Sequence, residues 1–272
     1  HHEQRNNLVQ GKMEKIELSV GERVTGFQME MWTMVPEIYR ISVLSPTGER
    51  LPDMVARPGN RQEYMFLFEQ TKLTVEYTIV GTRNSMQLIA LRFKNPMPGI
   101  WTVEIHGELV LSGNIFCWLP LSAFLSGEVF FLRSVPDTTI TIPGMSRVAI
   151  TVGAYSAVEG SIYPDSGRGF SSLDQVKPDI IAPGVNVKGP VWREEYEVRS
   201  GTSISAAFTA GACAQIFQWG IVENNMRYLN TTELKNLLIR GAGRDAERSY
   251  PNQVYGYGTL NLYDALLRLR EN

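Results

Sequence analysis

The pattern of apolar residues changes part way along this chain, and that change most constrains the fold. From about Met13 to Ile142, apolar residues alternate with polar ones in short runs that end at turn residues. The run from Leu73 to Val80, which stops at Gly81, is one example. Such runs at regular spacing are typical of antiparallel strands with one buried face. We therefore expect an all-β sandwich or jelly roll over residues 13–142.

The aromatic residues of this first part favour the same interpretation. They fall at positions that core strands require, and we expect them to be core rather than a ligand platform. They are Trp32, Tyr39, Tyr64, Phe66, Phe68, Tyr77, Phe93 and Trp101. His106 lies in the same alternation, and we interpret it as an ordinary strand residue. A sandwich that binds a saccharide or a peptide remains an alternative.

From Ser146 onward the pattern is that of an α/β domain. Val148 to Val152 is a continuous apolar run, which predicts a strand buried on both faces, as in a parallel sheet. Three helices are expected from residue periodicity and capping signals. They run from Thr202 to about Asn224, from a cap at Thr231-Thr232-Glu233 to Arg240, and from Leu260 to Arg270.

Composition excludes several classes of function. The 272 residues carry a net charge of −2 with both signs mixed along the chain, so a nucleic-acid or membrane-surface partner is not expected. No apolar run is long enough to span a bilayer. Cys117 and Cys213 are too isolated to indicate a disulfide framework, and Cys213 is expected to be a buried thiol.

The stretch from Ser200 to Gly211 concentrates the chemistry. Ser203 stands at the start of a helix that is apolar nearly all round, and such a helix is expected to be buried in a large domain. Unpaired N–H groups and the helix dipole favour an anion at this end. Taken alone, the string also fits a plain helix cap, because Ser and Thr are common N-cap residues.

Five blocks in a fixed order decide between these interpretations, and together they resemble the subtilase family of serine peptidases. Gly201-Thr202-Ser203 with Ala210-Gly211 resembles the nucleophile block of that family. The other blocks are Ile150-Thr151-Val152-Gly153-Ala154, Phe170-Ser171-Ser172, Lys177-Pro178-Asp179-Ile180-Ile181-Ala182-Pro183-Gly184 and Tyr255-Gly256-Tyr257-Gly258-Thr259-Leu260-Asn261.

The resemblance implies an α/β subtilisin-like parallel-sheet half-domain over residues 143–272 and a serine endopeptidase that cleaves proteins or peptides. Ser203 would be the nucleophile, and its backbone N–H would be one oxyanion donor. The motif residues Gly201, Thr202, Pro183, Gly184 and Gly153 would be structural. One departure is Ala207-Phe208, where the family usually has Pro-His.

The Asp, His and oxyanion Asn of the family have no counterpart in this sequence. The triad mechanism needs a general base for Ser203 and an acid that orients it. We therefore expect these residues upstream of residue 1, in a missing N-terminal part of the same subtilase, so that this chain alone is inactive. The alternative is a catalytically dead pseudopeptidase that acts as a sensor or scaffold.

The position of the sandwich resembles that of an inserted jelly roll in the Csp-type germination subtilases of spore-forming bacteria. That resemblance implies a bacterial protein, spore-associated or extracellular. It gives three segments: residues 1–12 as the tail end of an upstream subtilase segment, 13–142 as the inserted jelly roll, and 143–272 as the C-terminal part of the catalytic domain. His1 and His2 fit either a native upstream segment or the remnant of a purification tag.

A metal site is not indicated. Many subtilases bind Ca²⁺ through loop carboxylates and carbonyls. Asp165, Asp174 and Asp179 lie in or near loops, but they form no recognisable ligand string. We expect no obligatory cofactor.

Overall fold

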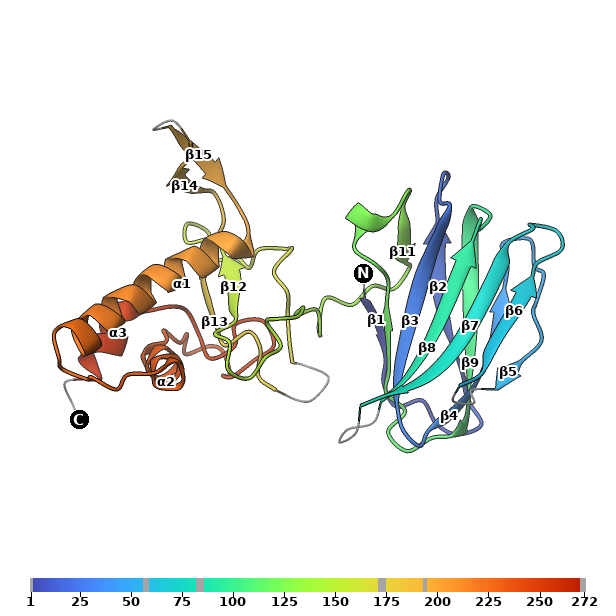
Figure 1. The fold of residues 1–272 in the computed structure, drawn as a ribbon, viewed down its shortest axis with the longest axis horizontal. Coiled ribbons are helices and arrows are strands. Elements are labelled where there is room, and N and C mark those ends of the chain that lie inside the picture. Colours follow the sequence, from blue (N-terminus) through green and yellow to red (C-terminus); the bar gives the residue numbers. More distant parts are fainter. Residues whose placement is uncertain (1, 56–58, 82–85, 171–174, 193–194, 270–272) are drawn as a thin grey trace. The chain divides into compact units, whose positions relative to one another are not determined.

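The computed structural model describes residues 2–55, 59–81, 86–170, 175–192 and 195–269 (Figure 1). Their contacts divide the chain into two compact units, His1–Val135 and Pro136–Asn272. From the sequence we expected the boundary after Ile142, whereas the contacts divide the units between Val135 and Pro136. Within the described ranges, no helix is both long and apolar enough to cross a membrane.

The first unit consists of two antiparallel sheets. The six-stranded sheet has the order β1-β10-β3-β8-β7-β6, and the five-stranded sheet has the order β11-β2-β9-β4-β5 (Figure 1). The strands are β1 His2–Arg5, β2 Met13–Val20, β3 Gly26–Met34, β4 Ile38–Leu44, β5 Met54–Val55, β6 Arg61–Met65, β7 Lys72–Val80, β8 Met86–Lys94, β9 Gly99–Leu109, β10 Ile115–Trp118 and β11 Val129–Phe131. A short 3₁₀ helix, Ser122–Phe124, precedes β11.

The segment 2–5 is part of this sandwich, because β1 pairs with β10 from His2↔Trp118 to Arg5↔Ile115. The sequence had assigned residues 1–12 to an upstream subtilase segment. Their origin stays a prediction, but in the structure their strand belongs to the six-stranded sheet.

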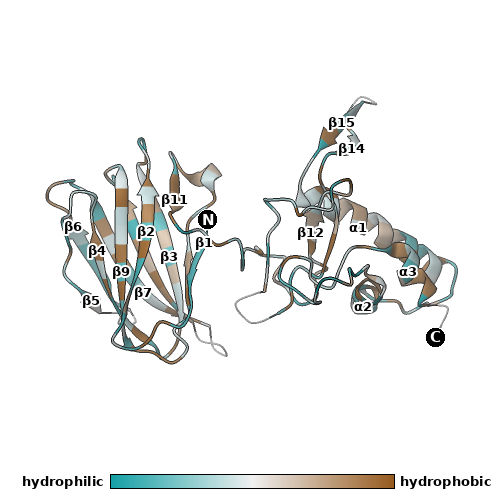
Figure 2. Ribbon diagram, turned by 180° about the vertical axis from the view of Figure 1, so that it is seen from behind, coloured by the Kyte–Doolittle hydropathy of each residue, from teal (hydrophilic) through white to brown (hydrophobic). Residues whose placement is uncertain are grey.

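Alternating side chains fill the space between the two sheets. Figure 2 shows bands of opposite hydropathy along strands such as β2 and β9. Trp101 lies at the centre, with its ring edge-on to Phe66 at 4.9 Å and to Phe93 at 5.3 Å between ring centroids. Such aromatic pairs add to the stabilisation from burial. Tyr39 and Tyr77 are also fully buried, as the alternation predicts.

The core prediction fails at Phe68, whose side chain is 81% exposed. Phe68 lies in the turn between β6 and β7, where the period-two pattern does not apply. The carboxylate of Glu49 accepts the backbone N–H groups of Leu67 and Phe68 at 3.0 and 3.1 Å. This contact fixes the turn backbone and leaves the Phe68 ring outside the core.

A buried carboxylate, Glu37, joins the turn before β4 to the turn between β9 and β10. It accepts the backbone N–H groups of Leu111, Ser112 and Gly113 at 3.0, 2.6 and 2.9 Å. The hydroxyls of Tyr39 and Ser112 donate to it as well. Burial alone would raise the pKa of Glu37, but these hydrogen bonds outweigh burial and lower the pKa below 4.5.

The second unit is built on a short parallel pair. Strand β12 (Val152–Tyr155) lies beside β13 (Ile180–Pro183), and helix α1 (Thr202–Phe217) packs against both. Helix α2 (Thr231–Gly241) packs against α3 (Leu262–Leu267), and an antiparallel hairpin, β14 (Val187–Pro190) and β15 (Tyr196–Arg199), precedes α1 (Figure 1). The core of this unit includes Ile180, Ile216 and Leu238.

Helix positions agree with the sequence, but their bounds do not. Helix α1 ends at Phe217 and continues as a π-helical turn over Gln218–Val222, whereas we expected a helix to Asn224. The cap of α2 is Asn230 rather than a threonine, because its side chain and that of Glu233 form a reciprocal capping box. The predicted strand 148–152 is also displaced: β12 begins at Val152, and Val148 is 71% exposed.

Cys117 and Cys213 are free cysteines. Cys117 is buried in the sandwich, while Cys213 in α1 is half-buried rather than fully buried. Burial raises the pKa of both thiols.

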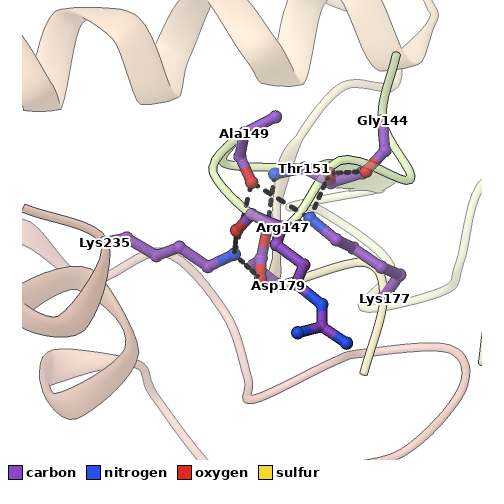
Figure 3. A network of polar contacts seen from close by, with 7 residues as sticks. All are labelled: Gly144, Arg147, Ala149, Thr151, Lys177, Asp179 and Lys235. Carbon is purple, nitrogen blue, oxygen red and sulfur yellow. Dashed lines mark hydrogen bonds and ion pairs between the residues drawn. The ribbon is translucent and has the colours of Figure 1, made fainter. Parts of the chain in front are cut away.

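A second buried carboxylate, Asp179, ties together three segments of this unit (Figure 3). It accepts the backbone N–H of Thr151 at 2.7 Å and pairs with Lys177 at 3.0 Å and Lys235 of α2 at 2.6 Å. Both ammonium groups also donate to the carbonyl oxygen of Ala149. Burial lowers the pKa of Lys177; the Asp179 carboxylate opposes this effect, and the nearby Lys235 adds to it.

Replacing Glu37 by glutamine should lower the free energy of unfolding by about 2 kcal/mol at neutral pH, because hydrogen bonds to a charged acceptor are lost. The native pKa is depressed, so this stabilisation is present above pH 4.5 and is lost as the pH falls through the native pKa. Urea unfolding from pH 7 to pH 3 should show the difference between wild type and Glu37→Gln shrinking on acidification. A difference that does not change with pH would contradict this account, and Glu22→Gln, at an exposed residue of the same unit, is the control.

Replacing Asp179 by asparagine should destabilise the chain by about 3–5 kcal/mol, because the buried Lys177 and the half-buried Lys235 lose their counter-charge. Glu197→Gln breaks the exposed pair with Arg199 and should change stability by less than about 1 kcal/mol. Urea unfolding of both variants at neutral pH makes the comparison. Equal stabilities would show that the buried pairs contribute no net stabilisation.

Candidate active site

Ser203 lies in the first turn of α1, with its side chain exposed. The residue before the helix, Gly201, has φ +152° and ψ 159°. A side chain is strained in that conformation, and glycine adopts it freely. The chain therefore turns abruptly from β15 into α1 at Gly201, and Thr202 begins the helix.

The start of α1 provides hydrogen-bond donors beside the Ser203 hydroxyl. The cap residue Gly201 supplies no side-chain acceptor, and the N–H of Ser203 is one of the first four of the helix, which lack intrahelical acceptors. The positive end of the dipole of this 16-residue helix lies at the same place. A nucleophilic oxygen and donors for a developing oxyanion are thus next to each other.

The residues that follow β13 hydrogen-bond to this turn. The N–H of Gly201 donates to the carbonyl oxygen of Gly184 at 2.7 Å, and the N–H of Asn186 donates to the hydroxyl of Ser200 at 2.9 Å. Pro183 ends the strand. The structure therefore brings the predicted Pro183-Gly184 block against the predicted Gly201-Thr202-Ser203 block, although they are distant in sequence.

Gly153 lies one strand away from that contact. It is buried in β12 opposite Ile181, and a Cβ at this position would be 3.0 Å from the Ser166 hydroxyl oxygen. A side chain at this position would therefore crowd the packing around β12. Of the predicted Phe170-Ser171-Ser172 block, the serines lie outside the described residues, as does Asp174.

One residue of the site was not singled out from the sequence. Ser205 is buried under the first turn of α1, and its hydroxyl lies within hydrogen-bond distance of two carbonyl oxygens of β13. The only sequence signal was a hydroxyl two positions after Ser203 in an apolar helix.

The second unit contains no histidine, because the three histidines of the sequence are residues 1, 2 and 106. His106 lies in β9 of the sandwich, as predicted. Asp179 is committed to its two lysines, and Asp165 interacts with the hydroxyl of Tyr163, whose pKa it raises. In the part of the chain that the structure describes, no group of His, Cys, Asp or Glu side chains could hold a metal ion.

The outer face of α1 contradicts the expectation that this helix is buried all round. Only Ser205, Thr209, Ala212 and Ile216 are buried. Ala206, Ala207, Ala210 and Gly211 are exposed, and Phe208 is 46% exposed. A groove of about 790 Å³ runs between this face and the β14–β15 hairpin, with Ala207, Phe208 and Gly211 among its lining residues.

Comparison with known proteins agrees with this geometry. The model of the subtilase family, Peptidase S8, matches residues 127–258. Serine protease AprX of Bacillus subtilis is 33% identical over 150 residues, which are 47% of this chain and 32% of AprX. Bacillopeptidase F of the same species is 25% identical over 166 residues, which are 54% of this chain and 11% of that protein. The chain thus spans about a third or less of these relatives.

A solved structure extends the similarity beyond the family match. The CspB protease of Clostridium perfringens superposes on all of this chain (100%) and on 57% of its own chain, with a TM-score of 0.90 and 26% sequence identity. The ordered motifs, the family match over residues 127–258 and this similarity agree with one another. Residues 127–258 therefore match the subtilase family of serine peptidases, and the motif blocks of that family lie in the second unit.

Proposed function

We propose that this chain is the nucleophile-bearing part of a subtilisin-like serine endopeptidase that acts on protein or peptide substrates. The observation that carries the proposal is the exposed Ser203 at the start of α1, which has no side-chain cap. The residues that follow β13, which lie in the region of the family match, hydrogen-bond to the turn before this helix. The similar CspB and AprX proteins are both named as proteases.

In the proposed reaction, the Ser203 oxygen attacks the scissile carbonyl carbon and its proton passes to a histidine base. The N–H of Ser203 donates to the oxyanion of the tetrahedral intermediate. The amine product leaves with the proton from that histidine, and water then hydrolyses the acyl-enzyme. The histidine, its aspartate and an oxyanion asparagine belong, in this proposal, to a segment that precedes residue 1. No step needs a metal ion.

The apolar face of α1 is the proposed contact surface for that segment. An apolar helix face exposed to water is unfavourable, and helices that are hydrophobic all round are buried in their proteins. The exposed Ala206, Ala207, Phe208 and Ala210 and the adjacent groove fit a packed neighbour of the same protein. The segment that carries the base would cover this face and reach Ser203 from it.

We assign the first unit as a jelly roll inserted before the nucleophile-bearing part. Consecutive strands β1 to β4 alternate between the two sheets. The six-stranded sheet contains the order β1-β10-β3-β8, and the five-stranded sheet contains the order β2-β9-β4-β5. Eight strands in two packed sheets with this alternation have the connectivity of a jelly roll. The similarity of CspB over the full chain supports the same placement.

The proposed function predicts labelling by a fluorophosphonate probe, in which the Ser203 oxygen bonds to phosphorus and fluoride leaves. The full-length protein, which carries this chain after the proposed upstream segment, should label at a single serine. Ser203→Ala should abolish labelling, since removing a triad member costs about 10⁶-fold in the rate. Ser146→Ala changes an exposed serine of the same unit and should label like wild type.

This chain alone should fold and remain unlabelled, because the base is absent. If the folded full-length protein does not label either, the peptidase proposal fails and a pseudopeptidase that acts as a sensor or scaffold takes its place. Labelling that persists in Ser203→Ala would place the nucleophile at another residue.

The proposed contact surface predicts that a charge on α1 prevents assembly with the upstream segment. The segment and this chain, expressed separately and mixed, should co-elute in size-exclusion chromatography. Phe208→Glu should weaken their association by about 100-fold, because the variant buries an unpaired charge. Val158→Glu adds the same charge at a residue that is 95% exposed and should not change the elution. If the Phe208→Glu chain co-elutes with the upstream segment at the same protein concentration as the wild-type chain does, this face is not the contact.

A further inference from the structure

We infer that Ser205 is a positioning residue for Ser203, through a hydroxyl that fastens the first turn of α1 to the end of β13. The inference rests on the proposed function, because it assigns a role within the same site. It does not follow from the motif, since the proposed reaction uses neither the hydroxyl nor the proton of Ser205.

The helix presents the two serines to opposite environments. Two residues along an α-helix correspond to a rotation of about 200°, so neighbours at this spacing point in nearly opposite directions. Ser203 is exposed, whereas Ser205 has 0% exposure. The Ser205 oxygen lies 2.9 Å from the carbonyl oxygen of Ala182 and 3.2 Å from that of Pro183. A buried hydroxyl is thus satisfied by the last two carbonyl groups of the strand.

A close approach of the backbone makes this contact possible. A Cβ on Gly184 would lie 2.2 Å from the Ser205 oxygen and 2.8 Å from the carbonyl oxygen of Gly201. Only glycine leaves that space. The Gly184 carbonyl oxygen in turn accepts the N–H of Gly201 at 2.7 Å.

Ser203 is therefore held on both sides by the same strand end. Gly201, two residues before it, is bonded to Gly184, and Ser205, two residues after it, is bonded to Ala182 and Pro183. Because the helix has no side-chain N-cap, these contacts help to fix where its first turn begins, together with the hydrogen bond from Asn186 to Ser200. A reacting group that shifts by 1 Å can lose about 100-fold in rate.

Thr209 provides a matched comparison. Its hydroxyl is also buried in α1, but it donates to the carbonyl oxygen of Ser205 within the same helix, at 3.0 Å. Removing it costs one buried hydrogen bond without detaching the helix from β13. Variants at either residue should therefore lose stability, but only variants at Ser205 should displace the first turn of α1 and with it Ser203.

The test measures the inactivation of the full-length protein by the fluorophosphonate probe, with the limiting rate constant kinact separated from the binding constant KI. Ser205→Ala should lower kinact about tenfold with KI unchanged. Ser205→Cys keeps the shape with a weaker donor and should lower kinact about threefold. Thr209→Val should keep the wild-type kinact while lowering the thermal midpoint about as much as Ser205→Ala.

A wild-type kinact in Ser205→Ala overturns the inference, as does an equal loss of kinact in Thr209→Val. If Ser205→Ala does not fold, Ser205→Cys decides, and a wild-type kinact in that variant overturns the inference. A wild-type protein that does not label shows instead that the proposed function has failed, so the two failures are distinguishable.

Discussion

The second unit depends on a single buried carboxylate. Asp179 precedes β13 directly, and it fixes the residue before β12 through Thr151 and helix α2 through Lys235. A buried charge without partners is strongly unfavourable, so the three segments must assemble together for the carboxylate to be satisfied. The strand that starts at this network ends four residues later at Pro183, where it meets the turn that carries Ser203. The position of the proposed nucleophile is thus linked through one short strand to an ion-pair network.

The first unit uses a buried carboxylate differently. Among the residues that the structure describes, Glu37 pairs with no cation; backbone N–H groups and hydroxyls satisfy it, favour the ionised form and lower its pKa. The backbone N–H groups that it accepts lie about 75 residues away in sequence. It closes two turns of the sandwich, whereas Asp179 joins a strand to a helix. In both units, a buried carboxylate fixes the relative position of segments, because its hydrogen bonds and ion pairs are directional and hydrophobic packing is not.

Much of the fold could be predicted from the sequence wherever a local rule applied. Period-two alternation placed the strands that bury Tyr39, Tyr77 and Trp101. Local rules failed where a distant group decided the outcome. Phe68 is aromatic like the core residues, but Glu49 binds the backbone of its turn and the ring stays outside the core. A second failure was local: the capping signal of α2 was visible at Thr231, but the reciprocal bonds of Asn230 and Glu233 make Asn230 the cap, and the helix begins at Thr231.

The candidate site divides in the same way. Ser203 and the Pro183-Gly184 block could be predicted because their motifs are contiguous strings with a fixed order. Ser205 could not be assigned a role, because its function depends on the direction in which the helix points it and on the carbonyl groups it meets there. A hydroxyl in an apolar helix indicates a buried hydrogen bond, but only the structure identifies the acceptor.

The exposed face of α1 shows how hydrophobic patterning and structure carry different information. Burial in this chain covers one side of the helix, while the residue composition is apolar on both sides. The composition of a helix reflects the environment in which the whole protein places it, since an apolar face is tolerated only where it is covered. The difference between the pattern and the observed burial therefore supports the proposed contact surface. That surface lies along Ala206, Phe208 and Ala210, on the helix whose first turn carries the proposed nucleophile. In this proposal, one upstream segment both covers the face and supplies the base to Ser203.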